Sequence, residues 1–354
     1  MTRPINRSVE GLRGVAALLV VISHCLAIGG FTLGVDLFFV LSGFLITRLL
    51  VGEIGNNGRI ALARFYIRRG FRLLPALVLF LLAVLTWGHL RGDAGGVASI
   101  HGTVLSSLLY VENWHILSVG TATPSLLVDP ATHTWSLSIE EQFYLLWPVL
   151  LIAGWRWKGA RGALILAVCG VALATVDRLG LAGTSLIREY FSTDTRADQL
   201  LAGCCVALLS QLRWLPRIPR GLSVAALGTL LAIGIHPFAL PYQMTATAVL
   251  GAVLVAGLSQ HQLGALSGSW VVWLGGRSYA LYLWHPLVRA ALHDSAHLAD
   301  GGVMFVAVMA VSLVVSDLTF RIVERPLRDL GRRLTSAPPL PSAGPQVPVA
   351  VIGR

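Results

Sequence analysis

Ten apolar segments constrain the fold of this 354-residue chain more than any other feature. Each is close to the ~20 mostly apolar residues with which a helix crosses the hydrocarbon core of a bilayer. Only 12% of the residues are charged, about half the share in globular chains. We therefore predict an all-α fold, a polytopic transmembrane helical bundle. Its ten spans lie near residues 12–28, 34–52, 73–91, 139–155, 162–178, 197–212, 221–236, 243–260, 270–291 and 302–320.

Three further sequence features bound the domain organisation. The segment 100–111 is too short and too polar for a span and is predicted to be interfacial or re-entrant. Residues 336–354, rich in Pro, Gly and Ser, predict a disordered cytoplasmic tail and leave 1–335 as one membrane domain. The four cysteines lie in apolar stretches, without the spacing of a zinc site or a disulfide framework, so no metal is expected.

The distribution of basic residues predicts the orientation of the chain. With the N-terminus inside and ten alternating spans, 22 of the 27 Lys and Arg residues fall on the inner side. Inner loops of membrane proteins collect Lys and Arg in this way, so both termini are predicted to be cytoplasmic. The formal charge of +10 would suggest nucleic acid in a soluble protein. Topology accounts for it here, and no nucleic-acid partner is expected.

Two ionisable residues in the first span suggest chemistry. Arg13 and His24 lie eleven residues apart, so they share a helix face about three turns and ~16 Å apart. Ionisable groups inside membranes usually mark function, although a topology anchor and a packed histidine would also explain them. Asp36, at the outer start of the second span, could contact His24 and orient it as a general base. It could also be a helix N-terminal charge favoured by the dipole.

Arginines gather after the second span. Arg64, Arg68 and Arg72 recur every four residues and form a helical stripe that Arg69 flanks. The stripe is either a positive-inside anchor that touches anionic lipid or a cradle for phosphates, which the forked guanidinium suits.

Several outer residues are candidates for an acceptor site. Glu140 and Glu141 open a helix and precede apolar residues, so at least one is expected to point into the bundle. Trp135 beside them is either an interfacial belt residue or a sugar-binding ring. Arg196 could contact the acceptor or pair with Asp198. The remaining candidate is His285, beside Tyr282 and Trp284, either catalytic or a packing residue.

Taken together, these motifs resemble membrane acyltransferase family 3, the integral-membrane O-acyltransferases of bacterial surface polysaccharides and related acceptors. Seven blocks carry the resemblance, in the order of the family. They are Arg13 and His24 with ten residues between them, GVDLFFVLSGFLI at 34–46, RRGFRLLP at 68–75, TWSLSIEEQFYLLWP at 134–148, TDTRADQLLAGC at 193–204, SYALYLWHPLV at 278–288 and ERPLR at 324–328.

The resemblance implies an enzyme in the bacterial cytoplasmic membrane that uses acyl-CoA, usually acetyl-CoA, as a cytoplasmic co-substrate. The acyl group would pass to a hydroxyl of a carbohydrate or glycosylated acceptor at the outer face. No further extracytoplasmic domain is expected, in contrast to some members of the family. A transporter or flippase of a lipid-linked surface-polymer precursor remains the alternative, which inverted repeats and broken spans would favour.

On this resemblance, three groups of residues receive roles. His24 is the expected general base, oriented by Asp36 or Glu140, or alternatively the carrier of an acyl-imidazole. The donor's phosphates are expected on Arg13, Arg68, Arg69 and Arg72. The acceptor side is assigned to Trp135, Glu141, Arg196 and His285.

Overall fold

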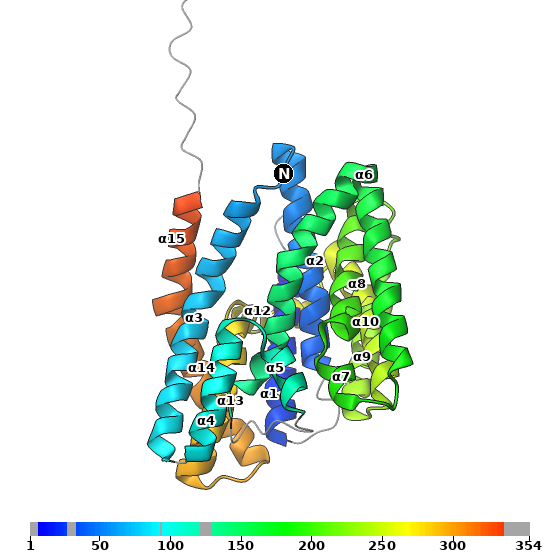
Figure 1. The fold of residues 1–354 in the computed structure, drawn as a ribbon. Helices are drawn as coiled ribbons and strands as arrows, with labels where there is room; N and C mark the ends of the chain where they lie inside the picture. The colour runs from blue at the N-terminus through cyan, green and yellow to red at the C-terminus, as the bar shows by residue number, and fades with distance from the viewer. Residues whose placement is uncertain (1–5, 27–32, 93, 121–128, 336–354) are drawn as a thin grey trace, which may run out of the picture.

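The computed structural model describes residues 6–26, 33–92, 94–120 and 129–335, and these form helices with no strand among them (Figure 1). The predicted tail 336–354 lies outside the described residues. In chain order the helices of the first half are α1 (Arg7–Leu26), α2 (Leu33–Asn57), α3 (Leu62–Arg91), α4 (Ala94–Leu108), α5 (Glu112–Val119), the 3-10 turn η1 (Thr132–Thr134), α6 (Trp135–Gly180) and α7 (Leu186–Phe191). Those of the second half are α8 (Thr193–Gln211), α9 (Arg220–Ile235), α10 (Leu240–Gln260), α11 (Gly264–Ser267), α12 (Ser269–Gly276), α13 (Ser278–Ala296), α14 (Gly302–Thr319), the π-helical turn η2 (Phe320–Glu324) and α15 (Arg325–Thr335).

Long apolar helices confirm the all-α membrane fold. Six helical stretches are long and apolar enough to cross a bilayer: α1, α2, α3, α10 and the stretches Thr132–Gly180 and Gly302–Thr335. Leucines such as Leu82 (55% exposed), Leu145 (65%) and Leu173 (72%) cover the outside of the bundle, where a bilayer would solvate them. The count of ten spans and the cytoplasmic position of both termini stay predictions.

Helix α6 contains a chain reversal. Lys158 and Gly159 leave the helical backbone conformation, and Gly159 has a φ of +60°, which glycine adopts without strain. The backbones on either side meet: a Cβ on Gly154 would lie 2.7 Å from the Cα of Ala163. The element is therefore a helical hairpin, and its two arms hold the predicted spans 139–155 and 162–178.

One predicted span is broken. Residues 270–291 were expected as a single helix, but α12 ends at Gly276 and α13 begins at Ser278, with Arg277 non-helical at φ −110° and ψ 3°. Helix α12 packs closely on the start of α1, because a Cβ on Gly14 would lie 2.6 Å from the carbonyl oxygen of Val271. The break lets α12 reach α1 and brings the first residue of α13 beside Arg13.

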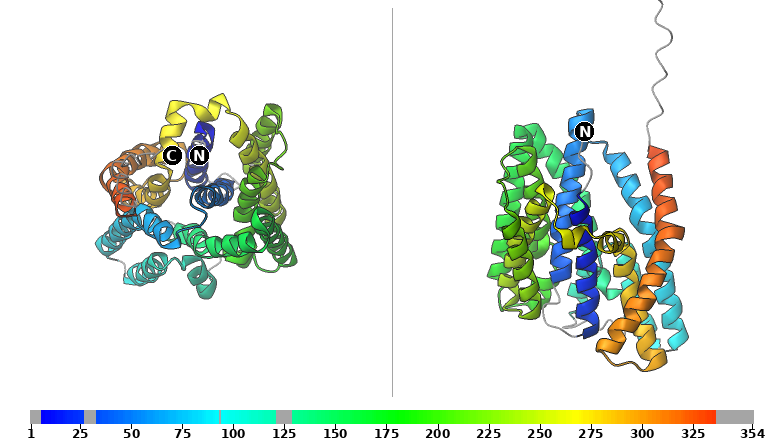
Figure 2. Two further views of the ribbon diagram at one scale, coloured as in Figure 1. Left: turned by 90° about the horizontal axis from the view of Figure 1, so that it is seen from above. Right: turned by 180° about the vertical axis from the view of Figure 1, so that it is seen from behind.

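Helices α1 and α2 lie inside the ring formed by the others when the molecule is viewed from above (Figure 2). One apolar cluster joins α2 to α6 and α8 through Phe39, Ile139 and Leu200. Another joins α1, α2 and α10 through residues that include Leu12 and Leu254. Buried aliphatic and aromatic side chains thus fix two sides of the central pair.

Candidate active site

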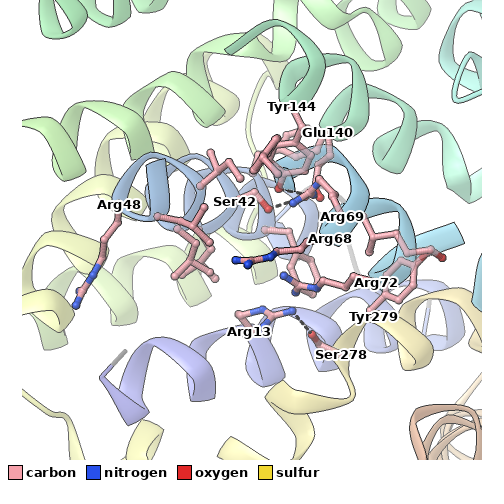
Figure 3. A pocket seen from close by; sticks show the side chains of 18 of the residues that line it. Arg13, Ser42, Arg48, Arg68, Arg69, Arg72, Glu140, Tyr144, Ser278 and Tyr279 are labelled. Carbon is pink, nitrogen blue, oxygen red and sulfur yellow. Dashed lines mark hydrogen bonds between the residues drawn. The ribbon is translucent and has the colours of Figure 1, made fainter. Parts of the chain in front are cut away.

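A cavity of about 590 Å³ lies between α1, α2, α3, α6 and α13 (Figure 3). Among its described lining residues, arginines outnumber glutamates. The arginines are Arg13, Arg48, Arg64, Arg68, Arg69 and Arg72, and the glutamates are Glu10, Glu53 and Glu140. This excess of positive charge in a concave site attracts anions.

Four of these arginines are the residues assigned to the donor by sequence. Arg68 and Arg72 lie one turn apart on α3, with Arg69 beside them, and Arg13 approaches from α1. Figure 3 shows the four side chains around one region of the cavity, whereas Arg48 lies apart from them. The structure therefore brings the predicted cluster together from two helices.

Hydrogen bonds hold two of the guanidinium groups in place. Arg13 donates to Ser278 Oγ at 3.2 Å and pairs with Glu10 at 3.1 Å. The Nε of Arg68 donates to Thr335 Oγ1 at 2.6 Å, at the end of α15. Both arginines are thus oriented by neighbouring elements before any ligand binds, which reduces the entropy lost on binding.

The other two guanidinium groups differ in their environment. Arg69 pairs with Glu141 at 3.0 Å, and its guanidinium carbon lies 3.1 Å from the centroid of the Tyr144 ring. Arg72 makes no hydrogen bond or ion pair with another described residue and lies in the electrostatic field of Arg13 and Arg69. Among the four, Arg72 therefore offers the donors least occupied by protein acceptors.

Glu140 and Glu141 both point into the bundle, as predicted for at least one of them, but they do not open the helix, because α6 begins at Trp135. Glu140 lines the cavity and accepts hydrogen bonds from Ser42 Oγ at 2.9 Å and from the Tyr144 hydroxyl at 3.4 Å. Glu141 instead borders a second cavity of about 400 Å³ on the other side of Arg69. The expected contact of Glu140 with His24 is wrong, because its carboxylate bonds to Ser42 and Tyr144 instead.

Three histidines form a cluster beside the cavity. His24 Nδ1 lies 2.8 Å from His285 Nε2, and the two rings are nearly parallel with centroids 5.0 Å apart. The His133 ring meets the His285 ring edge-on at 5.7 Å. Sequence reasoning gave no role to His133. Its position directly before the block TWSLSIEEQFYLLWP at 134–148 was the available signal.

Tyr282 separates the histidine cluster from the cavity. Its ring lies 5.9 Å from that of His285, and its hydroxyl bonds to Ser136 Oγ at 2.6 Å and donates to the carbonyl oxygen of His133 at 2.7 Å. Ser136, Tyr282 and Arg13 line this cavity, whereas His24 is not among the described residues around it.

Asp36 does not orient His24. Its carboxylate is fully buried and accepts hydrogen bonds from Arg196 Nη2 at 2.9 Å and from Thr247 Oγ1 at 2.8 Å. These partners come from α8 and α10, which both pack against α2. The expected His24–Asp36 contact is thus wrong, because the interior of the bundle selects a cation for this carboxylate.

Arg196 and Asp198 do not pair with each other either. Residues two positions apart on a helix point to different faces, and Asp198 pairs with Arg178 at 2.7 Å while Arg196 pairs with Asp36. Arg196 is fully buried and is also surrounded by aromatic rings. Its guanidinium carbon lies 5.2–5.6 Å from the ring centroids of Phe39, Trp135 and Tyr190.

Trp135 and Arg196 consequently sit in the packed interior. Trp135 is 6% exposed and also meets Phe191 edge-on at 5.0 Å. Neither residue is among the described residues that line the cavity. The structure assigns both to the cation–π cluster that joins α2, α6 and α8, which does not match a role in direct contact with an acceptor.

A sequence profile of the acyltransferase domain family matches residues 6–321. The chain belongs to the acyltransferase 3 family. Its relatives include the peptidoglycan O-acetyltransferase OatA of Listeria monocytogenes, 32% identical over 92% of this chain and 56% of the relative. YrhL of Bacillus subtilis, whose name assigns peptidoglycan O-acetylation provisionally, is 34% identical over 92% of this chain and 55% of the relative.

This acyltransferase 3 chain spans about half the length of the curated relatives it matches. No solved structure matches it with significance. Among the described residues, no group of three or more His, Cys, Asp or Glu side chains is arranged to hold a metal ion.

For a member of this family, the arrangement offers two separate functions. The arginine-lined cavity can hold a multiply charged anion by paired N–H donors. The histidine cluster beyond Tyr282 offers ring nitrogens that can take up and release a proton.

Proposed function

We propose that the chain is an O-acetyltransferase that takes its acetyl group from acetyl-CoA bound in the arginine-lined cavity. The observation that carries this proposal is the convergence of Arg13, Arg68, Arg69 and Arg72 on one region of that cavity. Coenzyme A carries a diphosphate and a 3′-phosphate, and guanidinium groups bind phosphate oxygens in a bidentate manner. The cavity volume of about 590 Å³ falls within the range of ligand pockets.

The donor is proposed to enter from the cytoplasm, with its pantetheine arm directed along α1. Arg13 and His24 are separated by ~16 Å along that helix, a length that an extended arm spans. Tyr282 lies between the cavity and the histidine cluster. Displacement of its side chain would open the way for the thioester to reach His24.

His24 is proposed to act as general base. Its ring nitrogen takes the proton of the acceptor hydroxyl as the oxygen forms a bond with the thioester carbonyl carbon. The carbon–sulfur bond then breaks, and the thiolate of coenzyme A takes the proton back from His24. Transfer through an acetyl-imidazole on His24 would instead leave a covalent intermediate in the absence of acceptor.

The acceptor is proposed to be a hydroxyl of a cell-envelope carbohydrate on the outer face of the bacterial cytoplasmic membrane. The support comes from the name of OatA, which is a peptidoglycan O-acetyltransferase. Trp135 and Arg196 are not proposed to bind it, because both lie in the packed interior.

The test uses purified protein in lipid nanodiscs with acetyl-CoA and soluble peptidoglycan fragments. Binding of acetyl-CoA is measured by calorimetry, and transfer is measured by mass spectrometry of the fragments. We expect the wild type to bind and transfer, and His24→Ala to bind with similar affinity and lose transfer by at least about 100-fold. Normal transfer by His24→Ala, or wild type that moves a lipid-linked sugar without cleaving the thioester, would overturn the proposal.

A further inference from the structure

We propose that His285 is a positioning residue that holds His24 in the one neutral tautomer whose Nε2 carries the free lone pair. The inference deepens the proposed function, since it names the atom of His24 that takes the acceptor's proton. It rests on a chain of hydrogen bonds that links the Leu281 carbonyl, His285 and His24.

The chain of hydrogen bonds begins at a backbone carbonyl group, which can act only as an acceptor. The Leu281 carbonyl oxygen lies 3.0 Å from His285 Nδ1. Nδ1 of His285 therefore carries the hydrogen. In a neutral imidazole the other nitrogen is then an acceptor, so His285 Nε2 presents a lone pair.

The hydrogen bond between His285 and His24 then fixes the tautomer of His24. His24 Nδ1 lies 2.8 Å from His285 Nε2, which must accept. Nδ1 of His24 is consequently the protonated nitrogen, and Nε2 of His24 keeps its lone pair. Nε2 forms no hydrogen bond with another described residue, and the His24 side chain is only partly buried.

Packing keeps the two rings in this relation. The His24 and His285 rings are nearly parallel, at an interplanar angle of 12°, as a hydrogen bond in the plane of both rings requires, and His285 is fully buried. His133 is held in the same way, since its Nδ1 lies 2.7 Å from the Pro130 carbonyl oxygen. The buried His285 ring cannot flip without losing its bond to the Leu281 carbonyl.

A neutral acceptor suits this position in the membrane. A carboxylate would bring a buried charge to the cluster, which costs free energy unless it is paired. The nearby cation Arg289 is already paired with Asp300 at 2.6 Å. An imidazole acceptor orients His24 while leaving the resting cluster without an unpaired charge, and the retained Nδ1–H bond still stabilises the imidazolium formed during transfer.

Two substitutions separate positioning from packing. In His285→Gln, the side-chain oxygen can occupy the place of Nε2 and accept from His24 Nδ1. In His285→Asn, the shorter amide can bond to the Leu281 carbonyl but does not reach His24. Both variants remove the ring and keep a polar amide, so a merely structural role would affect them alike.

The first readout is the nitrogen-15 spectrum of histidine-labelled protein in nanodiscs, with His24 assigned by the signals missing from His24→Ala. We expect a protonated Nδ1 and an unprotonated Nε2 for His24 in the wild type and in His285→Gln. His285→Asn is expected to show a mixture of tautomers. A wild-type His24 protonated at Nε2 would overturn the inference.

The second readout is the split between kcat and KM for acetyl-CoA. We expect His285→Gln to keep kcat within about tenfold and His285→Asn to lose about 100-fold, both with unchanged KM, because general-base catalysis depends on the lone pair. Equal kcat values for the two variants would also overturn the inference. A wild type that transfers no acetyl group would contradict the proposed function instead, and the spectrum would still decide the tautomer.

Discussion

The buried pair of Asp36 and Arg196 allows a structural role to be separated from a catalytic one. Both side chains are fully buried, and the ion pair of 2.9 Å joins α2 to α8. Breaking a buried ion pair by removing one partner costs about 3–5 kcal/mol. In Asp36→Ala the Thr247 hydroxyl also loses its acceptor, and in Arg196→Met the Asp36 carboxylate loses its hydrogen bond from Arg196 Nη2.

A double-mutant cycle measures this coupling. We expect Asp36→Ala and Arg196→Met each to destabilise the protein by about 3–5 kcal/mol. The double variant should lose much less than the sum, since neither charge remains unpaired. Unfolding by denaturant in mixed micelles gives the free energies of the four proteins.

The exposed pair of Arg188 and Asp194 serves as the matched control. Its atoms are also close, at 2.6 Å, but the side chains are 40% and 45% exposed. Solvent screening limits such pairs to about 1 kcal/mol or less. The reasoning is refuted if Asp36→Ala is as stable as the wild type and yet transfers no acetyl group, because Asp36 would then act in the chemistry.

Three further perturbations test other parts of the structure. Arg72→Met should raise the Kd for acetyl-CoA about 10–100-fold in calorimetry, since a charge-assisted hydrogen bond contributes about 1.5–3 kcal/mol; unchanged affinity would remove Arg72 from the donor site. Burial raises the pKa of Glu112 from its ordinary value of 4.5 to about 8. Between these two pH values the folded protein holds a proton on Glu112 that the unfolded chain has released. Stability should therefore fall as the pH rises between these values, and Glu112→Gln should flatten this part of a thermal-melting series from pH 4 to 9. Gly14→Ala should lower the melting temperature because its Cβ would lie 2.6 Å from the Val271 carbonyl, whereas Gly55→Ala, with nothing within 4 Å, should not.

Local periodicity predicted the parts of the candidate site that come from one helix. The spacing of Arg68 and Arg72 placed both on one side of α3, and the separation of eleven positions between Arg13 and His24 placed both on one face of α1. The prediction that at least one of Glu140 and Glu141 faces the interior was confirmed, whereas the prediction that they open the helix was wrong, because α6 begins at Trp135. Helical periodicity also shows why the suggested pairing of Arg196 with Asp198 was wrong. The two residues are two positions apart and point to different faces of their helix.

Contacts between helices were not predictable in this way. His24 and His285 are 261 residues apart, and Arg196 and Asp36 are 160 residues apart. Which of them meet depends on which helices become neighbours and on the rotation of each about its axis. A pattern of apolar residues restricts that rotation but does not name the partner.

The sequence by itself determined that the chain is a bundle of apolar helices and that its arginines gather on one stretch of α3, because helix formation and membrane insertion depend on consecutive residues. Only the tertiary structure decided that a histidine, rather than a carboxylate, lies within hydrogen-bonding distance of His24 and that Tyr282 lies between the arginines and the histidines. The physical reason is that a buried polar group bonds to whatever donor or acceptor the packing of the helices brings within reach.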